Sequence, residues 1–73
     1  MITYKVGCLV TTYADHRKVG VVLEVNDDET YWEDLEDKYL PYTTMVIRWA
    51  DGSQEDYEIY GPPEEQGDLP IVG

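Results

Sequence analysis

The chain has few of the features that stabilise very small proteins. It contains a single cysteine, Cys8, so no disulfide can form within its 73 residues. A chain of this length buries only about 60% of the surface that its unfolded form exposes, so a disulfide or a metal is a common support. We therefore expect one modestly stable domain over residues 1–73. Cys8 is expected to be a small buried hydrophobe in a reducing compartment, either the cytoplasm or the inside of a virus particle.

Long apolar runs are also absent from the sequence. The longest one, 19–23, is interrupted by Gly20, whereas a membrane-spanning helix needs roughly 20 apolar residues. The first residues do not combine a basic stretch, an apolar run and a small-residue cleavage site, so we expect no secretory signal. The sequence predicts no membrane association and a cytoplasmic location.

Basic residues are scarce, with five Lys and Arg against sixteen Asp and Glu, and the net charge is −11. Residues 1–25 hold three basic and two acidic residues, so the remaining residues carry a net charge of −12. Binding to nucleic-acid phosphates needs clustered Lys and Arg, so direct nucleic-acid binding is not expected. The charge favours a protein partner with a basic surface. The competing interpretation is that the acidity only keeps the domain soluble.

The sequence lacks the residue sets that catalysis and metal binding require. His16 is the only histidine and Ser53 the only serine, and Ser53 lies in a predicted turn, so no nucleophilic triad is expected. The acidic residues within 27–37 do not have the alternate spacing and central glycine of a calcium loop. One cysteine and one histidine are too few for a typical zinc site. We expect no enzyme, no metal and no cofactor.

Apolar and polar residues alternate over most of the chain, which is typical of strands. We predict an all-β fold with five antiparallel strands, near 4–12, 19–25, 42–50, 53–60 and 69–72. Asp51 and Gly52, between the third and fourth of these, are typical of a tight hairpin turn in which both central residues have positive φ. The alternation predicts a core that contains Val10, Val21, Leu23, Met45, Ile47, Trp49, Tyr57 and Ile59.

Between the second and third predicted strands, residues 26–41 lose the alternation and predict a long acidic loop. Loops of this length are often functional or partly structured, and one helical turn over 31–37 would place Tyr31, Leu35 and Tyr39 on one face. Tyrosine and tryptophan among carboxylates suit the recognition of a basic partner, although these rings could instead cap the ends of a barrel. The predicted partner-binding residues are Asp27, Asp28, Glu29, Tyr31, Trp32, Glu33, Asp34, Glu36, Asp37 and Tyr39.

Three segments together resemble the small Src-homology-3-like barrels of the Tudor and KOW type. They are 6–10 with its glycine, the valine-rich 20–25, and 46–52 with its aromatic-x-Asp-Gly hairpin. The chain also resembles short proteins of tailed bacteriophages, including those of cyanobacteria. The resemblance implies a five-stranded barrel over about 4–60, a C-terminal return over 61–73, and a location in the host cytoplasm or the virion.

The ligands of these barrels do not carry over to this chain. KOW barrels that bind nucleic acid carry a basic face, which is absent here. Tudor barrels that read methylated side chains hold an aromatic cage, but two of its candidates here, Trp49 and Tyr57, are predicted to lie in the core. The resemblance therefore implies a fold and leaves the function open.

Three functions follow as hypotheses. The first is a non-enzymatic protein-binding or structural module that contacts its partner through the acidic loop and the strand edges. The second is an acidic inhibitor that mimics nucleic acid and occupies the basic groove of a host nucleic-acid-binding protein. The third is a minor virion or assembly component that forms homo-oligomers through residues 69–73.

Overall fold

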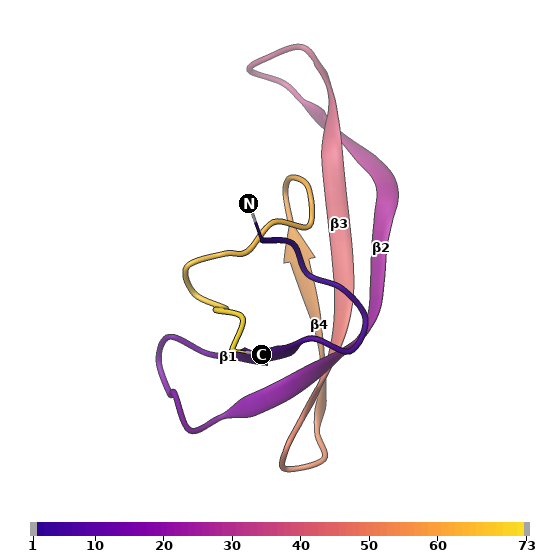
Figure 1. Ribbon diagram of the computed structural model, residues 1–73. Coiled ribbons are helices and arrows are strands. Elements are labelled where there is room, and N and C mark those ends of the chain that lie inside the picture. The colour runs from indigo at the N-terminus through magenta and orange to yellow at the C-terminus, as the bar shows by residue number, and fades with distance from the viewer. Residues whose placement is uncertain (1, 73) are drawn as a thin grey trace.

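The computed structural model describes residues 2–72 and is all-β. Four strands, β1 (Leu9–Thr11), β2 (Val19–Glu33), β3 (Lys38–Trp49) and β4 (Gln54–Ile59), form one antiparallel sheet in the order β1-β2-β3-β4. The sheet curls into a half-barrel, and the hairpin of β2 and β3 extends well beyond the rest of it (Figure 1). No helix is present among residues 2–72, so none there could cross a membrane.

The open side of the half-barrel is covered by the two ends of the chain. Thr3 forms an isolated bridge with Glu64, and Val10 forms another with Ile71. Around the second bridge, the Thr11 N–H donates to the Pro70 carbonyl and the Val72 N–H to the Leu9 carbonyl. Residues 69–72 therefore lie beside β1 through an isolated bridge, and the predicted fifth strand is not confirmed.

The first strand is much shorter than the predicted 4–12. Gly7 has a φ of 93°, a left-handed conformation that few other residues adopt. The turn at this glycine is closed by the Cys8 N–H, which donates to the Lys5 carbonyl at 3.0 Å. Regular pairing with β2 therefore starts only at Leu9.

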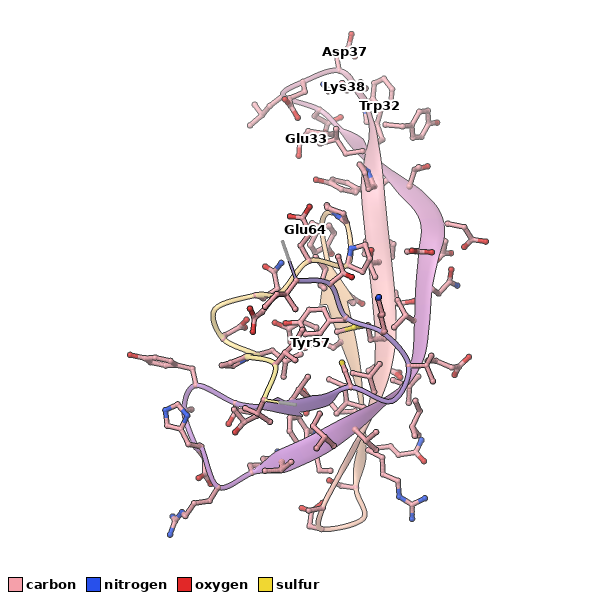
Figure 2. The ribbon with its side chains drawn as sticks, in the orientation of Figure 1. Trp32, Glu33, Asp37, Lys38, Tyr57 and Glu64 are labelled. Carbon is pink, nitrogen blue, oxygen red and sulfur yellow. The ribbon has the colours of Figure 1, made fainter. Side chains whose placement is uncertain are left out.

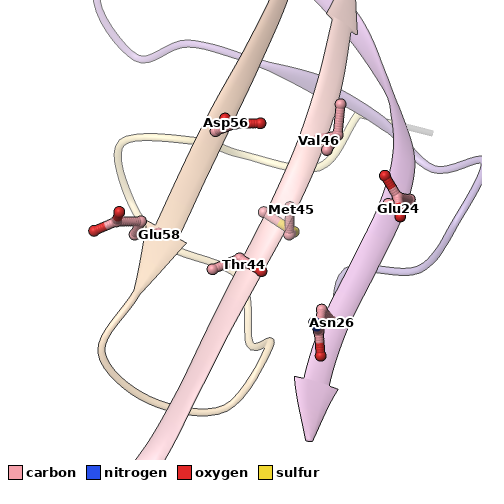
Figure 3. A pocket seen from close by; sticks show the side chains of 7 residues that line it. All are labelled: Glu24, Asn26, Thr44, Met45, Val46, Asp56 and Glu58. Carbon is pink, nitrogen blue, oxygen red and sulfur yellow. The ribbon is translucent and has the colours of Figure 1, made fainter. Parts of the chain in front are cut away.

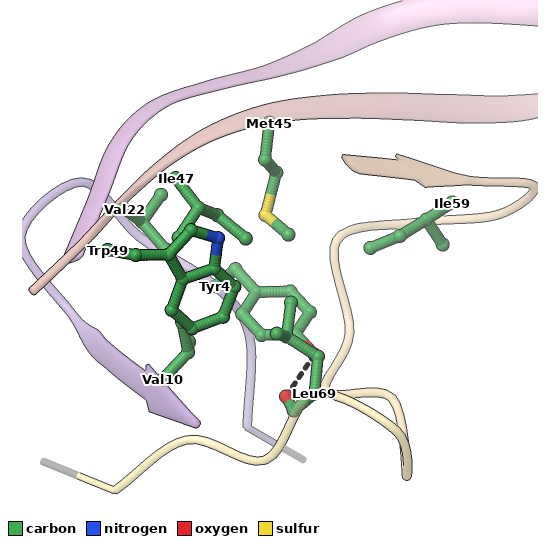
Figure 4. Packing of buried hydrophobic residues seen from close by; sticks show 8 residues of the cluster. All are labelled: Tyr4, Val10, Val22, Met45, Ile47, Trp49, Ile59 and Leu69. Carbon is green, nitrogen blue, oxygen red and sulfur yellow. Dashed lines mark hydrogen bonds between the residues drawn. The ribbon is translucent and has the colours of Figure 1, made fainter. Parts of the chain in front are cut away.

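The core lies between the inner face of the sheet and the two chain ends (Figure 4). β3 supplies its centre because every second residue from 43 to 49 is buried. The prediction is confirmed for Val10, Met45, Ile47, Trp49 and Ile59, whereas Tyr57 is only partly buried. The complete buried hydrophobic set is Tyr4, Val10, Val22, Met45, Ile47, Trp49, Ile59 and Leu69.

Two predicted core residues of β2, Val21 and Leu23, are wrong. Val22 is fully buried, Val21 is half-buried on the outer face and Leu23 is exposed. The reason is a β-bulge: the register with β3 shifts between Val22 and Glu24, so Leu23 is an extra residue without a partner. Beyond the bulge, Val25 faces inward again and packs against the core.

Gly20 lies in regular pairing opposite Trp49. A Cβ at this position would lie 2.7 Å from Trp49 Cε3 and 2.8 Å from Ile47 Cγ2. The missing side chain therefore makes room for the indole, which is 3% exposed and donates from Nε1 to Glu55 Oε1 at 3.0 Å.

The hairpin predicted at Asp51 and Gly52 is confirmed, with a different turn. Only Gly52 has positive φ, at 91°, and its N–H donates to the Trp49 carbonyl. Asp51 instead uses its carboxylate, which accepts hydrogen bonds from the Ser53 N–H and hydroxyl. These bonds lower the pKa of Asp51.

The predicted acidic loop is wrong, and so is the helical turn within it. β2 continues to Glu33 and β3 begins at Lys38, so only residues 34–37 form a turn. We call residues 29–42 the hairpin arm, since β4 pairs with β3 only from Thr43 onward. Figure 2 shows Trp32, Glu33, Asp37 and Lys38 at the tip of this arm, far from Tyr57.

Candidate functional site

A shallow groove runs across the outer face of the sheet, opposite the core (Figure 3). β3 supplies its floor, Thr44 and Val46, which are half-buried. β2 supplies one wall and β4 the other, because Glu24 lies opposite Val46 on one side and Asp56 lies opposite it on the other. The groove has a volume of about 310 Å³ and is lined by Glu24, Asn26, Thr44, Met45, Val46, Asp56 and Glu58.

The groove is lined by three carboxylates, none of which forms an ion pair within residues 2–72. Glu24 stands on one wall, and Asp56 and Glu58 stand on the other. The single ion pair within residues 2–72 joins Arg17 and Asp15 at 3.5 Å, and neither residue lines the groove. The three carboxylates are therefore open to a cation supplied from outside.

A cluster of three tyrosines adjoins the groove at its Glu58 end. Ring centroids of Tyr31 and Tyr60 are 5.2 Å apart, those of Tyr42 and Tyr60 are 5.3 Å apart, and those of Tyr31 and Tyr42 are 6.4 Å apart. The Tyr60 hydroxyl donates to Glu58 Oε2 at 3.4 Å. Partial desolvation, and next the Glu58 carboxylate, raise the pKa of Tyr42. This tyrosine cluster extends the groove with amphipathic rings of the kind enriched at interfaces.

The predicted aromatic site residues are divided between the two faces of the arm. Tyr31 is paired with Leu40 and lies on the same face as the groove. Trp32 is paired with Tyr39 on the opposite face, where their ring centroids are 5.1 Å apart. Trp32 is 48% and Tyr39 68% exposed, so this pair forms an exposed apolar spot near the tip.

The predicted carboxylates are spread along the arm and do not converge on one point. Asp27 and Asp28 form a second bulge at the base of the arm, where the register shifts between Asn26 and Glu29. The tip residues lie around the turn, where Glu33 Oε1 accepts a hydrogen bond from the Leu35 N–H. Asp34, Glu36 and Asp37 are exposed, and Asp37 has a φ of 54°.

The metal-ligating side chains in the described part of the chain do not gather into a metal-binding group. No group of three or more His, Cys, Asp or Glu side chains within 2–72 could hold a metal ion. His16 is exposed beside Tyr13, with ring centroids 6.1 Å apart, and Ser53 donates to Asp51 in the hairpin turn. Cys8 is partly buried against the core.

Sequence reasoning missed the groove because its floor and two walls come from three different strands. The predicted core residues of β3 and β4 do imply that the residues between them, Thr44, Val46, Asp56 and Glu58, point away from the core. Glu24 also faces away from the core, but the sequence did not indicate that Glu24 and Asp56 both lie opposite Val46. None of the protein-family models, curated proteins and solved structures compared with the chain matches it.

Proposed function

We propose that the chain is a non-enzymatic module that binds a basic segment of another protein across the outer face of its sheet. The observation that carries this proposal is the groove, with carboxylates on both walls and no ion pair to any of them within residues 2–72. A lysine or arginine placed over Val46 would have a carboxylate on either side. The tyrosine cluster adds ring faces that attract cations.

The finer fold assignment belongs to the same proposal. A Src-homology-3-like barrel, with residues 69–72 in the place of a fifth strand, is supported by the curled sheet and by the bridge between Val10 and Ile71. Barrels of this kind host many functions, so the fold does not favour any particular partner.

The open shape of the groove supports binding over catalysis. A catalytic carboxylate usually needs an enclosed site that excludes water and shifts its pKa. Asp56 and Glu58 are exposed, and the groove lies on an open sheet face. The nucleic-acid mimic and the virion component stay predictions, because no feature of the groove favours either.

The test compares two variants with the same net charge. The groove variant carries Glu24→Gln, Asp56→Asn and Glu58→Gln, and the tip variant carries Asp34→Asn, Glu36→Gln and Asp37→Asn. Asparagine tolerates the left-handed conformation of Asp37, so the tip should keep its fold. The probe is a fluorescent nine-residue peptide that alternates lysine and valine, with binding followed by fluorescence anisotropy at low and high salt.

We expect the groove variant to bind the peptide roughly tenfold more weakly, since each partly exposed charge pair contributes about 0.2–1 kcal/mol. The tip variant should lose much less, and high salt should weaken all three proteins. If the two variants lose affinity equally, only overall charge matters and the groove is not the binding site. If only the tip variant loses affinity, the arm carboxylates predicted from the sequence are the binding residues.

A further inference from the structure

The two edges of the sheet differ in how they are covered. At the β1 edge, the C-terminal segment forms backbone hydrogen bonds with Leu9 and Thr11. At the other edge, β4 is paired with β3 alone. Within residues 2–72 no backbone hydrogen bond joins residues 54–59 to any segment other than β3. β4 therefore presents a row of unpaired peptide groups, which is the template that an added strand uses.

The hydrogen-bond ladder identifies which peptide groups of β4 point outward. The Trp49 N–H donates to the Ser53 carbonyl, on the side of β4, whereas the Ala50 N–H donates to Val19, on the side of β2. Along an antiparallel strand the backbone N–H and carbonyl groups of successive residues point to alternate sides. The backbone groups of residues 55, 57 and 59 therefore point toward β3, as the Ser53 carbonyl does. The N–H and carbonyl groups of Gln54, Asp56 and Glu58 consequently point away from the sheet.

The side chains along this edge specify the chemistry of an incoming strand. On the outer face they are Gln54, Asp56 and Glu58, and two of these are carboxylates of the groove. On the inner face they include Tyr57, which is partly buried, and Ile59, which is 5% exposed. A second copy of the chain would place like charges opposite each other across the new ladder, which is destabilising. An oppositely charged strand would place lysine or arginine beside Asp56 and Glu58.

We propose that the partner segment binds in extended form as an added strand on β4, with basic residues alternating with apolar ones. Its basic side chains lie beside Asp56 and Glu58, on the β4 wall of the groove, and its apolar side chains lie beside Tyr57 and Ile59 on the inner face. This inference rests on the proposed function and adds backbone pairing to it. The carboxylates then have two effects on the same edge, since they prevent pairing between copies and favour a basic strand.

The test uses two versions of the lysine–valine peptide with identical charge. One carries N-methyl groups on three central lysine amides, and the other carries them on three central valine amides. Only alternate amides of an added strand face the sheet, so one methylated peptide should bind at least tenfold more weakly through the loss of two or three hydrogen bonds. The other should bind within about twofold of the parent, because its methyl groups point to solvent.

Two other outcomes separate the inference from the function on which it rests. If both methylated peptides bind as tightly as the parent while the groove variant still weakens binding, the added strand is wrong and the basic groove stands. If the parent peptide binds no better than a peptide with serine in place of lysine, the proposed function itself fails. Equal weakening of both methylated peptides also overturns the added strand, because an added strand exposes one set to solvent.

A pair of protein variants tests the same contact from the side of β4. Asp56→Asn removes the charge and keeps the outward N–H, whereas Asp56→Pro removes both. Proline is tolerated on an edge strand where the N–H faces solvent, and a thermal melt verifies the fold. We expect the proline variant to bind the parent peptide several-fold more weakly than the asparagine variant. Equal affinity of two folded variants would overturn the added strand.

Discussion

Gly20→Ala is the sharpest test of how the core is packed. The new Cβ would lie 2.7 Å from Trp49 Cε3, 2.8 Å from Ile47 Cγ2 and 3.1 Å from the Arg48 carbonyl oxygen. All three distances are shorter than ordinary van der Waals contact, so the indole or the strand must move. Overpacking of this kind costs about 1–3 kcal/mol, against a total stability of roughly 4–11 kcal/mol for 73 residues.

The assay for this prediction is thermal unfolding followed by circular dichroism. A net loss of about 2 kcal/mol should lower Tm by roughly 8–16 °C. Gly67→Ala is the matched control, because its Cβ would meet nothing within 4 Å, and its Tm should stay within a few degrees of the parent. In a Trp49→Phe background, Gly20→Ala should cost less, since the smaller ring relieves the closest contact.

A Gly20→Ala protein that melts like the Gly67→Ala control would refute this account of the packing. Strict additivity with Trp49→Phe, together with a large loss in Gly20→Ala alone, would instead locate the clash at Ile47 or at the backbone of Arg48.

Three further predictions concern stability. Trp49→Ala should leave the domain largely unfolded at 37 °C by circular dichroism, since losing a buried indole costs about 3–5 kcal/mol; a parent-like melt would contradict the inward placement of the ring. Tyr4→Phe should cost about 1–3 kcal/mol in urea unfolding, because the buried hydroxyl donates to Leu69 and accepts from Gln66; an unchanged midpoint would contradict this. Burial raises the pKa of Tyr4 above 10.0, so the folded state holds its proton more tightly and Tm should fall above pH 10, less steeply in Tyr4→Phe; equal slopes would assign the effect to other groups.

The parts of the fold that follow from local pattern could be predicted from the sequence. The strict alternation of β3 placed Met45, Ile47 and Trp49 in the core, and Asp51 with Gly52 marked the hairpin. Both features depend on residues close together in the chain. Tyr4 and Leu69 could not be predicted as a buried pair, because their hydrogen bond joins positions 65 residues apart.

The errors on β2 and its hairpin arm have one common cause, which is the pair of bulges in β2. A bulge adds one residue to a strand and reverses the face of every residue after it. Because of the bulge at Leu23, Val22 and Val25 both face inward although they are three positions apart. The second bulge, at Asp27 and Asp28, hides the alternation of the arm, so a paired strand looked like a loop.

The exposed edges of the two long strands give the acidity a structural reason. β1 covers β2 only over residues 19–21, and β4 does not reach the arm, so both long strands have exposed edges. Exposed edges invite pairing with other copies, and bulges and charges are the common protection. Solubility and binding are then not competing interpretations. A carboxylate-lined edge that rejects its own copies is also the edge on which we propose that a strand of opposite charge binds, and the N-methylated peptides distinguish an edge that is only protected from one that is used.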